Sequence, residues 1–183
     1  YKGQIGKVAP NLLNRDFTAT RPNQKWVTDV TEFKVQGQKI YLSPILDLFN
    51  GEVISYSLST SPSFPTTIEM LKKAFRRLPE KVDLMLHSDQ GWQYQMRPYQ
   101  MLLAERGIQQ SMSRKGNCYD NAVIENFFGL LKSEFFNGQV FQSVDVFQKE
   151  LVDYLEYYNN DRIKVKLKGL SPVAYRTQSN FFT

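Results

Sequence analysis

The order of strand-like and helix-like patterns limits the fold of this chain more than any other sequence feature. Three strand-like segments joined by short turns come first, and the Asn50-Gly51 pair between the last two is a strong hairpin signal. After Pro62 and Pro65, helical and strand-like segments alternate. This order predicts an α/β fold in which three antiparallel strands and then parallel strands form one sheet covered by helices.

The expected elements follow from hydrophobic periodicity. We expect strands over residues 25–33, 39–48, 52–59, 82–86 and 108–112, and helices over residues 66–77, 98–106, 121–136 and 144–158. Asp120 is expected to cap the third helix, and the polar segment 113–119 before it to be mobile. We expect residues 1–22 to form an arm or linker, residues 23–160 the core domain, and residues 161–183 a basic extension.

Composition narrows the chemistry that a site in this chain can use. The 183 residues, 42% of them hydrophobic, suffice for one globular domain. Because Cys118 and His87 are the only residues of their kinds, neither an intrachain disulfide nor a Cys/His zinc site can form, and a reducing compartment is the natural expectation. Any catalytic metal would therefore rest on carboxylates. We expect no transmembrane helix and no secretion leader, and the start at Tyr1 suggests a fragment.

The net charge of +5 is concentrated near the two ends of the chain. Basic residues outnumber acids five to one from residue 161 onward, and four to one before residue 22. Localised positive charge favours a polyanionic partner, although basic ends can also serve solubility alone.

Three acids lie where acids are uncommon or where ligands bind. Asp29 falls within an expected strand, Asp89 follows an expected buried strand, and Glu125 lies one turn into the third helix. Each also has a structural alternative: a strand-edge Asp, an Asx-turn, and a solvated helix face. The spacing of 35 residues between Asp89 and Glu125 is by itself weak evidence for a shared site. With 18 acids in 183 residues, about every tenth position is an acid.

The helix that carries Glu125 has a flat face. Lys132 lies seven positions after Glu125, about 20° from the same line along the helix. Gly129 stands between them, so no side chain separates the carboxylate from the ammonium. Such a strip suits a DNA backbone. The alternative is an exposed helix face on which the glycine merely costs ~1 kcal/mol.

The surroundings of the three acids resemble a known family. Residues 26–31 (WVTDVT), 87–91 (HSDQG) and 120–132 (DNAVIENFFGLLK) are similar to the three catalytic blocks of insertion sequence 3 family transposases, the transposases closest to retroviral integrases. The resemblance covers residues 26–176 and includes the gap of 35 residues. It implies a ribonuclease-H-like fold with a five-stranded mixed sheet.

The resemblance also implies a chemistry. Asp29, Asp89 and Glu125 would be the catalytic, metal-binding triad of a D,D,E-type polynucleotidyl transferase, and Lys132 would contact DNA near the transposon end. We expect two Mg²⁺ or Mn²⁺ ions about 3.5–4 Å apart, with Asp29 bridging them. The implied partners are transposon-end and target DNA, with a homo-oligomer assembled on DNA, no membrane, and a separate N-terminal DNA-binding region. The implied compartment is the bacterial cytoplasm, at the nucleoid when DNA is bound.

The sequence departs from the family near its end. Lys164 stands where His is usual and Lys168 where Gly is usual, so a role for that His is in doubt here. Arg162, Lys164, Lys166 and Lys168 alternate with apolar residues, and an extended segment would present one basic face. We hypothesise that this face binds DNA phosphates.

Other polar and aromatic side chains near the acids have open roles. His87 could orient Asp89 or move a proton, but a lone sheet histidine is more often structural. Asp47 is a rival carboxylate that we interpret as structural, because a hairpin turn follows it. The loop aromatics could stack on unpaired bases or only pack the loops; they are Trp92, Tyr94 and Tyr119.

Two other functions remain as alternatives to transposition. One is a nuclease of the same fold that cuts RNA–DNA hybrids or branched DNA, and the family blocks disfavour it. The other is a nucleic-acid-binding module without catalysis, which has no need to gather three carboxylates where phosphates bind.

Overall fold

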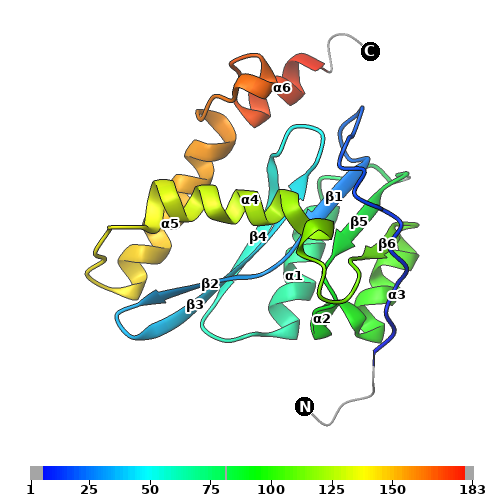
Figure 1. Ribbon diagram of the computed structural model, residues 1–183, viewed down its shortest axis with the longest axis horizontal. Coiled ribbons are helices and arrows are strands. Elements are labelled where there is room, and N and C mark those ends of the chain that lie inside the picture. The colour runs from blue at the N-terminus through cyan, green and yellow to red at the C-terminus, as the bar shows by residue number, and fades with distance from the viewer. Residues whose placement is uncertain (1–5, 81, 180–183) are drawn as a thin grey trace.

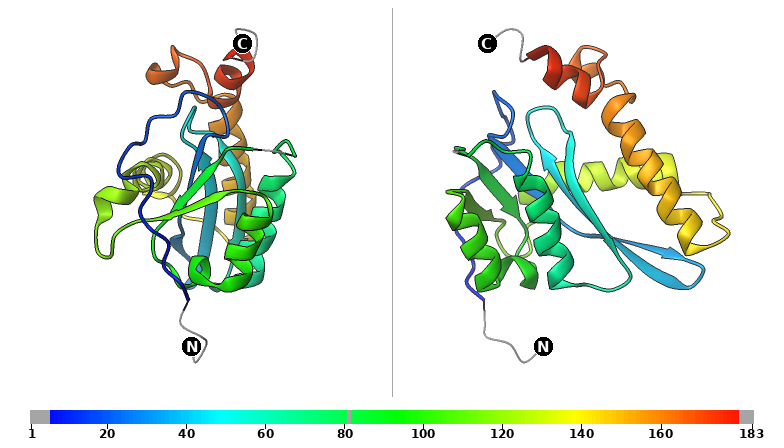
Figure 2. Two further views of the ribbon diagram at one scale, coloured as in Figure 1. Left: turned by 90° about the vertical axis from the view of Figure 1, so that its right-hand side faces the viewer. Right: turned by 180° about the vertical axis from the view of Figure 1, so that it is seen from behind.

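The computed structural model describes residues 6–80 and 82–179 as a mixed sheet with helices on both sides (Figures 1 and 2). The strands are β1 Lys25–Thr28, β2 Thr31–Val35, β3 Gln38–Asp47, β4 Val53–Ser59, β5 Met85–Ser88 and β6 Gln109–Met112. The α-helices are α1 Phe64–Phe75, α2 Trp92–Gln95, α3 Arg97–Glu105, α4 Ala122–Leu131, α5 Val144–Asn160 and α6 Pro172–Ser179. Short 3₁₀ turns η1 Cys118–Asn121 and η3 Val165–Leu167 and a π-helical turn η2 Lys132–Phe136 complete the chain.

The sheet has the expected mixture of directions. β3 pairs antiparallel with β4 on one side and with both β1 and β2 on the other. β1 then pairs in parallel with β5, and β5 in parallel with β6. The antiparallel meander followed by parallel strands is thus confirmed, and its carboxyl edge at β1, β5 and β6 is where an α/β sheet binds ligands.

The first strand differs from the expectation in one detail that matters for the site. The expected single strand over residues 25–33 is split into β1 and β2, so the sheet has six strands instead of five. Both pieces keep one register on β3, with Thr28 opposite Ile45 and Thr31 opposite Leu42, and Asp29 therefore stands opposite Pro44. Proline has no N–H to donate, so the ladder is interrupted there.

Two apolar cores lie on the two faces of the sheet. Successive residues of β1 serve opposite cores, because side chains alternate along a strand: Trp26 packs with α1 and α3, and Val27 packs with α4 and α5. Figure 2 shows α1 and α4 on opposite sides of the strands. Within the described residues, no helix is long and apolar enough to cross a membrane.

The chain before β1 lies against the molecule beside β6 (Figure 1). The Met112 amide donates to the Pro10 carbonyl, and the Leu12 and Leu13 amides donate to Ser111 Oγ at 2.9 and 3.1 Å. This part of the expected arm is therefore held along the core; residues 1–5, with Lys2, and residues 180–183 lie outside the described chain.

The start of α4 corrects one expectation. Asp120 does not cap the helix: it lies in η1, fully buried, and Asn121 occupies the N-cap position without a capping side-chain hydrogen bond. The Asp120 carboxylate instead accepts from the guanidinium groups of Arg114 and Arg15 at 2.8 Å. Charge-assisted bonds to guanidinium groups are stronger than a bond to a backbone amide, which explains the preference.

Candidate active site

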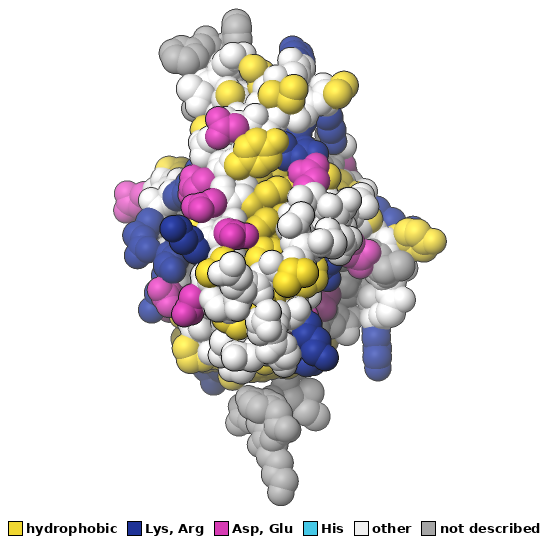
Figure 3. All heavy atoms as spheres, turned by 90° about the vertical axis from the view of Figure 1, so that its left-hand side faces the viewer, with side chains coloured by type: hydrophobic (Ala, Val, Ile, Leu, Met, Phe, Trp, Pro, Cys, Tyr) yellow, Lys and Arg dark blue, Asp and Glu magenta, His cyan; other side chains and the backbone are white. Residues whose placement is uncertain are grey.

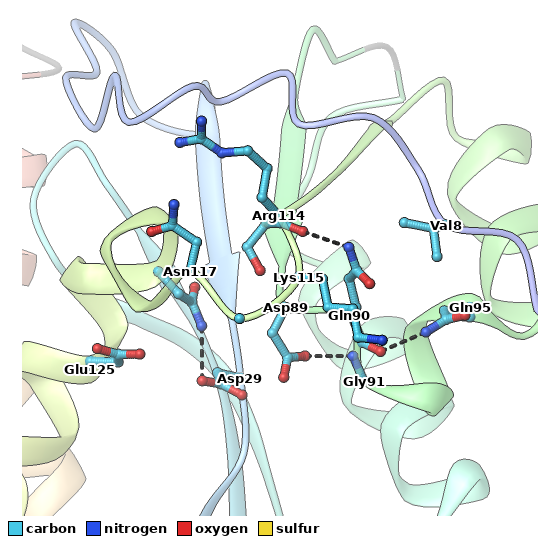
Figure 4. A pocket seen from close by; sticks show the side chains of 13 residues that line it. Val8, Asp29, Asp89, Gln90, Gly91, Gln95, Arg114, Lys115, Asn117 and Glu125 are labelled. Atoms are coloured by element: carbon cyan, nitrogen blue, oxygen red, sulfur yellow. Dashed lines mark hydrogen bonds between the residues drawn. The ribbon is translucent and has the colours of Figure 1, made fainter.

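The carboxyl ends of the parallel strands open into one cleft. Asp29 directly follows β1, Asp89 follows β5 and Ser113 follows β6. These residues and Glu125 of α4 line a cavity of 730 Å³ (Figure 4). Three acids that are far apart in sequence are thus brought to one cleft by two strand ends and one helix.

Asp29 is the most confined of the three carboxylates. Its Oδ1 accepts from the Val30 amide at 2.7 Å. Its Oδ2 accepts from Asn121 Nδ2 at 2.8 Å, the dashed line that ends on Asp29 in Figure 4. Burial, followed by the negative charge of Asp89 and with a smaller effect of Glu125, raises the pKa of Asp29 from 3.8 to about 7. Burial and the two neighbouring carboxylates therefore disfavour the ionised form of Asp29.

Asp89 closes a tight turn at the end of β5. Its Oδ1 accepts from the Gly91 amide at 2.8 Å, which is the Asx-turn of the structural alternative. Burial raises the pKa of this carboxyl as well. Because the turn occupies only Oδ1, it does not conflict with a ligand role for the other oxygen.

Glu125 approaches the same cleft from α4. Its side chain is exposed and points from the helix toward Asp29 and Asp89 (Figure 4). The apolar side of α4 is buried against the core through Ile124, Phe127, Phe128 and Leu131, and this packing fixes the direction of Glu125.

The carboxylates suit a hard cation such as Mg²⁺ whose remaining ligands are water and phosphate oxygens. No three His, Cys, Asp or Glu side chains among the described residues are gathered closely enough to hold an ion unaided. Yet burial and mutual repulsion hold the pKa of Asp29 high, so a nearby cation would stabilise its ionised form. Oxygen ligands completed by water and phosphate are what Mg²⁺ prefers.

The loop after β6 carries side chains that sequence reasoning did not single out. Arg114, Lys115 and Asn117 line the cleft, and Asp120 holds Arg114 by three hydrogen bonds. Arg15 also binds Asp120 and donates to Asn117 at 3.1 Å. The loop expected to be mobile is therefore anchored at its Arg114 end.

Comparison with known proteins assigns the chain to a family. The sequence matches the integrase core domain family over residues 19–118, and an integrase core domain again over residues 125–179. The chain belongs to the integrase core domain family. It is 59% identical over 179 residues to the putative transposase of insertion sequence element IS150 of Escherichia coli, covering 98% of this chain and 63% of that protein.

Other relatives are transposases too, and confirm the resemblance to the insertion sequence 3 family. A transposase-like protein of Haemophilus influenzae is 58% identical, with 98% of this chain and 82% of that protein covered. The transposase of insertion sequence IS3fB of Escherichia coli is 36% identical, with 98% and 62% covered. The chain thus spans about two thirds of the two Escherichia coli transposases.

Solved integrase structures share the fold of this integrase core domain. The HTLV-2 integrase catalytic core in complex with magnesium aligns with a TM-score of 0.61 at 19% identity, over 87% of this chain and 99% of that chain. The simian T-cell lymphotropic virus intasome, in complex with a PP2A regulatory subunit, aligns with a TM-score of 0.68 at 20% identity, over 88% and 56%. The expected ribonuclease-H-like fold is confirmed.

His87 and Asp47, the two other titratable side chains considered for the site, both have structural contacts in this integrase core domain. His87 is fully buried: its Nδ1 lies 2.8 Å from Ser111 Oγ, and its Nε2 lies 2.9 Å from the Asp120 carbonyl oxygen. Burial lowers its pKa, which favours the neutral ring. Asp47 is also fully buried, and binds Arg176 and the Asn23 and Phe49 amides instead of lining the acidic cleft.

The basic face expected near the end of the chain is corrected. The segment is not extended, since Val165–Leu167 forms the 3₁₀ turn η3. Arg162 pairs with Glu134, and the half-buried Lys164 donates to the Tyr158 hydroxyl at 2.6 Å. Of the four basic residues, Lys166 and Lys168 are exposed. Lys168 and Gly169 take left-handed backbone conformations, so the chain turns here instead of continuing extended.

Lys132 and the three loop aromatics differ in how far they are buried and in what they contact. Lys132 begins η2, half-buried, with Nζ 5.7 Å from the Phe33 ring centre. Tyr94 is fully buried against Tyr99, so it packs the core and cannot stack on bases. Tyr119 and Trp92 remain 69% and 43% exposed.

Proposed function

We propose that this chain is the catalytic core of an insertion-sequence transposase that cuts phosphodiester bonds at the element's ends and joins them to target DNA. The observation that carries the proposal is the convergence of Asp29, Asp89 and Glu125 on one open cleft at the carboxyl edge of the sheet. Transposase relatives and the integrase fold support the same reaction class.

The three carboxylates would hold divalent magnesium. The related HTLV-2 core was determined with magnesium, and the oxygen donors here suit Mg²⁺ or Mn²⁺. Two bound ions would supply activation of the attacking oxygen and stabilisation of the leaving oxygen. Asn121 would keep Asp29 directed into the cleft, since its amide already donates to Asp29 Oδ2.

The chemistry consists of two in-line displacements at phosphorus. In cleavage, a water oxygen bonds to the phosphorus and the 3′ oxygen of the element leaves as a hydroxyl. In joining, that 3′-hydroxyl attacks a target phosphodiester, and the target's own 3′ oxygen leaves. Lys115, which lines the cleft and is exposed, would offset charge on the bound phosphates.

DNA and a second copy of the chain are the proposed partners. The flat face of α4, with Glu125 and Gly129 exposed and Lys132 at its end, would receive the backbone of the transposon end. A homo-oligomer would hold two ends together, and the reaction would take place in the bacterial cytoplasm. Residues 23–160 would form the core, and residues before 23 would lead from an N-terminal DNA-binding region.

A joining assay tests the proposal. A labelled oligonucleotide with the element's end and a target plasmid are incubated with this chain, together with the sequence that precedes it in the full-length protein. We expect nicking and then joined product with Mg²⁺ or Mn²⁺, none with EDTA, and loss of both in Asp89→Asn but not in the control Asp153→Asn, which changes an exposed carboxylate.

The alternatives give different products. Cutting without joining would contradict the proposal and would indicate that the chain is a nuclease. DNA binding without any cutting would replace it by a binding module.

A further inference from the structure

A second, smaller pocket lies on the other flank of α4. Its volume is 320 Å³, and it is enclosed by the hairpin between β3 and β4, by α4, and by the segment that contains η3. Apolar side chains form much of its wall, among them Leu48, Phe127 and Leu130. Two lysines, Lys164 and Lys166, also line it.

Lys164 is a half-buried cation that lines the pocket. Its Nζ donates to the Tyr158 hydroxyl at 2.6 Å and lies 4.3 Å from the centre of the Tyr158 ring. No ion pair of Lys164 is formed within the described residues. Burial, and then the charges of Arg162 and Lys166, lower its pKa to about 8, against a smaller opposite effect of Glu134, whose carboxylate pairs with Arg162. An ammonium has three donors, so two remain for a ligand.

The surroundings of Lys164 hold this ammonium in place. The Tyr158 hydroxyl donates to the Gly51 carbonyl at 2.9 Å, which ties α5 to the hairpin. Gly51 has φ +70, and a Cβ there would lie 2.8 Å from Lys164 Nζ. The hairpin therefore approaches the ammonium closely, and the position of the charge is set by packing rather than by a flexible stem.

The charge of the pocket is positive overall. Lys166 is exposed and forms no ion pair within the described chain. The acid among the lining residues, Asp47, is fully buried and already bound by Arg176 and two backbone amides. Two ammonium groups that form no ion pair within the described residues, beside an apolar wall, match an anion that carries apolar surface, as a phosphate between deoxyriboses does.

α4 is the common wall of this pocket and the acidic cleft. Asn121 and Glu125 line the cleft, whereas Val123 and Asn126 line the pocket. A helix with its side chains is about 10–12 Å across, and one DNA strand carries a phosphate every ~3.4 Å along the axis. A strand that crosses α4 would therefore place its phosphate at the pocket about three nucleotides from the cleft.

We propose that the pocket lined by Lys164 and Lys166 is a phosphate subsite for the DNA strand that leaves the acidic cleft across α4. This inference rests on the proposed function, because it assumes that the cleft holds a DNA end. It gives Lys164 a role, because its ammonium, held by Tyr158, lines the pocket and forms no ion pair within the described residues.

Salt dependence of DNA binding tests the subsite without any catalysis. Binding of an end duplex to the full-length protein is measured in EDTA over a range of salt concentrations, for wild type and for the double variant Lys164→Gln/Lys166→Gln. We expect the slope of log affinity against log salt to fall by about 1, the change for one lost phosphate contact. The single variant Lys166→Gln, at an exposed side chain that leaves the core intact, should show part of this change.

A matched control removes two charges on the opposite face of the sheet. Lys72→Gln/Arg76→Gln changes exposed side chains at the end of α1 and should leave the slope unchanged. An unchanged slope in the Lys164 and Lys166 variants, or an equal fall in the control, would overturn the proposal. Loss of self-association at an unchanged slope would overturn it too, and would assign the pocket to a contact between copies.

Uncharged methylphosphonate analogues can identify which DNA phosphate contacts the pocket. Single methylphosphonates are placed in turn within five nucleotides of the cleaved bond. We expect one position to weaken wild-type binding about tenfold, and the double variant to be insensitive at that position. Equal sensitivity of both proteins at every position would contradict the subsite. Because no step needs metal or cleavage, these results remain separate from a failure of the joining assay.

Discussion

Asp29 shares its cleft with two other carboxylates, and hydrogen bonds from Val30 and Asn121 offset their repulsion. Its place follows from Pro44, which cannot donate to the strand at the position opposite Asp29. The acids themselves could be predicted, because each lies in a recognisable sequence block. Asn121 could not, since its bond to Asp29 joins residues 92 positions apart.

The raised pKa of Asp29 predicts a pH-dependent stability of the metal-free protein. The folded pKa, about 7, exceeds the unfolded value of 3.8, so the stabilising effect is complete below pH 3.8 and is lost as the pH rises through 7. We expect Asp29→Asn to be more stable than wild type at pH 8 by about 1–4 kcal/mol, and the difference to vanish near pH 4.

Chemical denaturation in EDTA at both pH values measures this difference. The control Asp153→Asn changes an exposed carboxylate and should follow wild type at both pH values. A destabilised Asp29→Asn at pH 8 would mean that the Asp29 charge is not repelled in the folded protein.

At the scale of elements, the sequence predicts the structure of α4 more accurately than that of the segment after α5. The helical period predicts an apolar stripe of Val123, Ile124, Phe127 and Leu131, and the last three are buried, whereas Phe128 is buried in place of Val123. The alternation over residues 162–168 predicted an extended segment, yet Leu167 is 4% exposed and Val165 97%. Local alternation fails here because the chain turns at Lys168, which has a left-handed backbone conformation with φ 57.

Substitutions of Gly129 can distinguish the effect of the flat face of α4 on stability from its effect on DNA binding. Nothing lies within 4 Å of a Cβ built at this exposed position. Gly129→Ala should therefore raise stability by about 0.5–1 kcal/mol in urea denaturation. Gly129→Leu should also fold but should bind end DNA more weakly, because its side chain fills the strip. Equal DNA affinity of the Leu and Ala variants would show that DNA does not cross this face.

The turn at Lys168 gives a second prediction at this scale. A left-handed conformation costs a non-glycine residue ~1–2 kcal/mol, so Lys168→Gly should raise the free energy of unfolding by up to ~1 kcal/mol. The control Lys166→Gly, at a residue of η3 without positive φ, should lower it. Destabilisation by Lys168→Gly would indicate that its side chain makes a contact that outweighs the backbone cost.

At the scale of the whole molecule, buried ion pairs join distant parts of the chain. Arg176 of α6 binds Asp47 and Glu52 at the hairpin, and Arg77 after α1 binds Glu52. On the face shown in Figure 3, Lys and Arg side chains lie among Asp and Glu side chains. The basic tail of the sequence is therefore partly neutralised by acids from elsewhere, which residue counts along the chain cannot predict.

Removal of the Arg176 charge should lower the free energy of unfolding, because the buried carboxylates of Asp47 and Glu52 would lose an ion-pair partner. Asp47 and Glu52 are 0% and 1% exposed, so Arg176→Met leaves two buried carboxylates without this partner. We expect a loss of about 3–5 kcal/mol in unfolding free energy, measured by denaturation at pH 7. The control Arg76→Met removes an exposed charge and should change stability by less than about 0.5 kcal/mol. A similarly small change in Arg176→Met would mean that α6 is not anchored to the hairpin.

The most direct test of the site compares two identical substitutions on neighbouring helices. Glu125→Gln removes a proposed metal ligand on α4, and Glu150→Gln changes an exposed carboxylate on α5. Joined product is quantified with Mg²⁺ and with Mn²⁺, after equal DNA binding has been verified. We expect Glu125→Gln to lose at least ~100-fold in joining, since even outer contacts of a metal site are worth 10–100-fold, and Glu150→Gln to match wild type. Wild-type joining by Glu125→Gln would contradict the assignment of this carboxylate and of the three-carboxylate site.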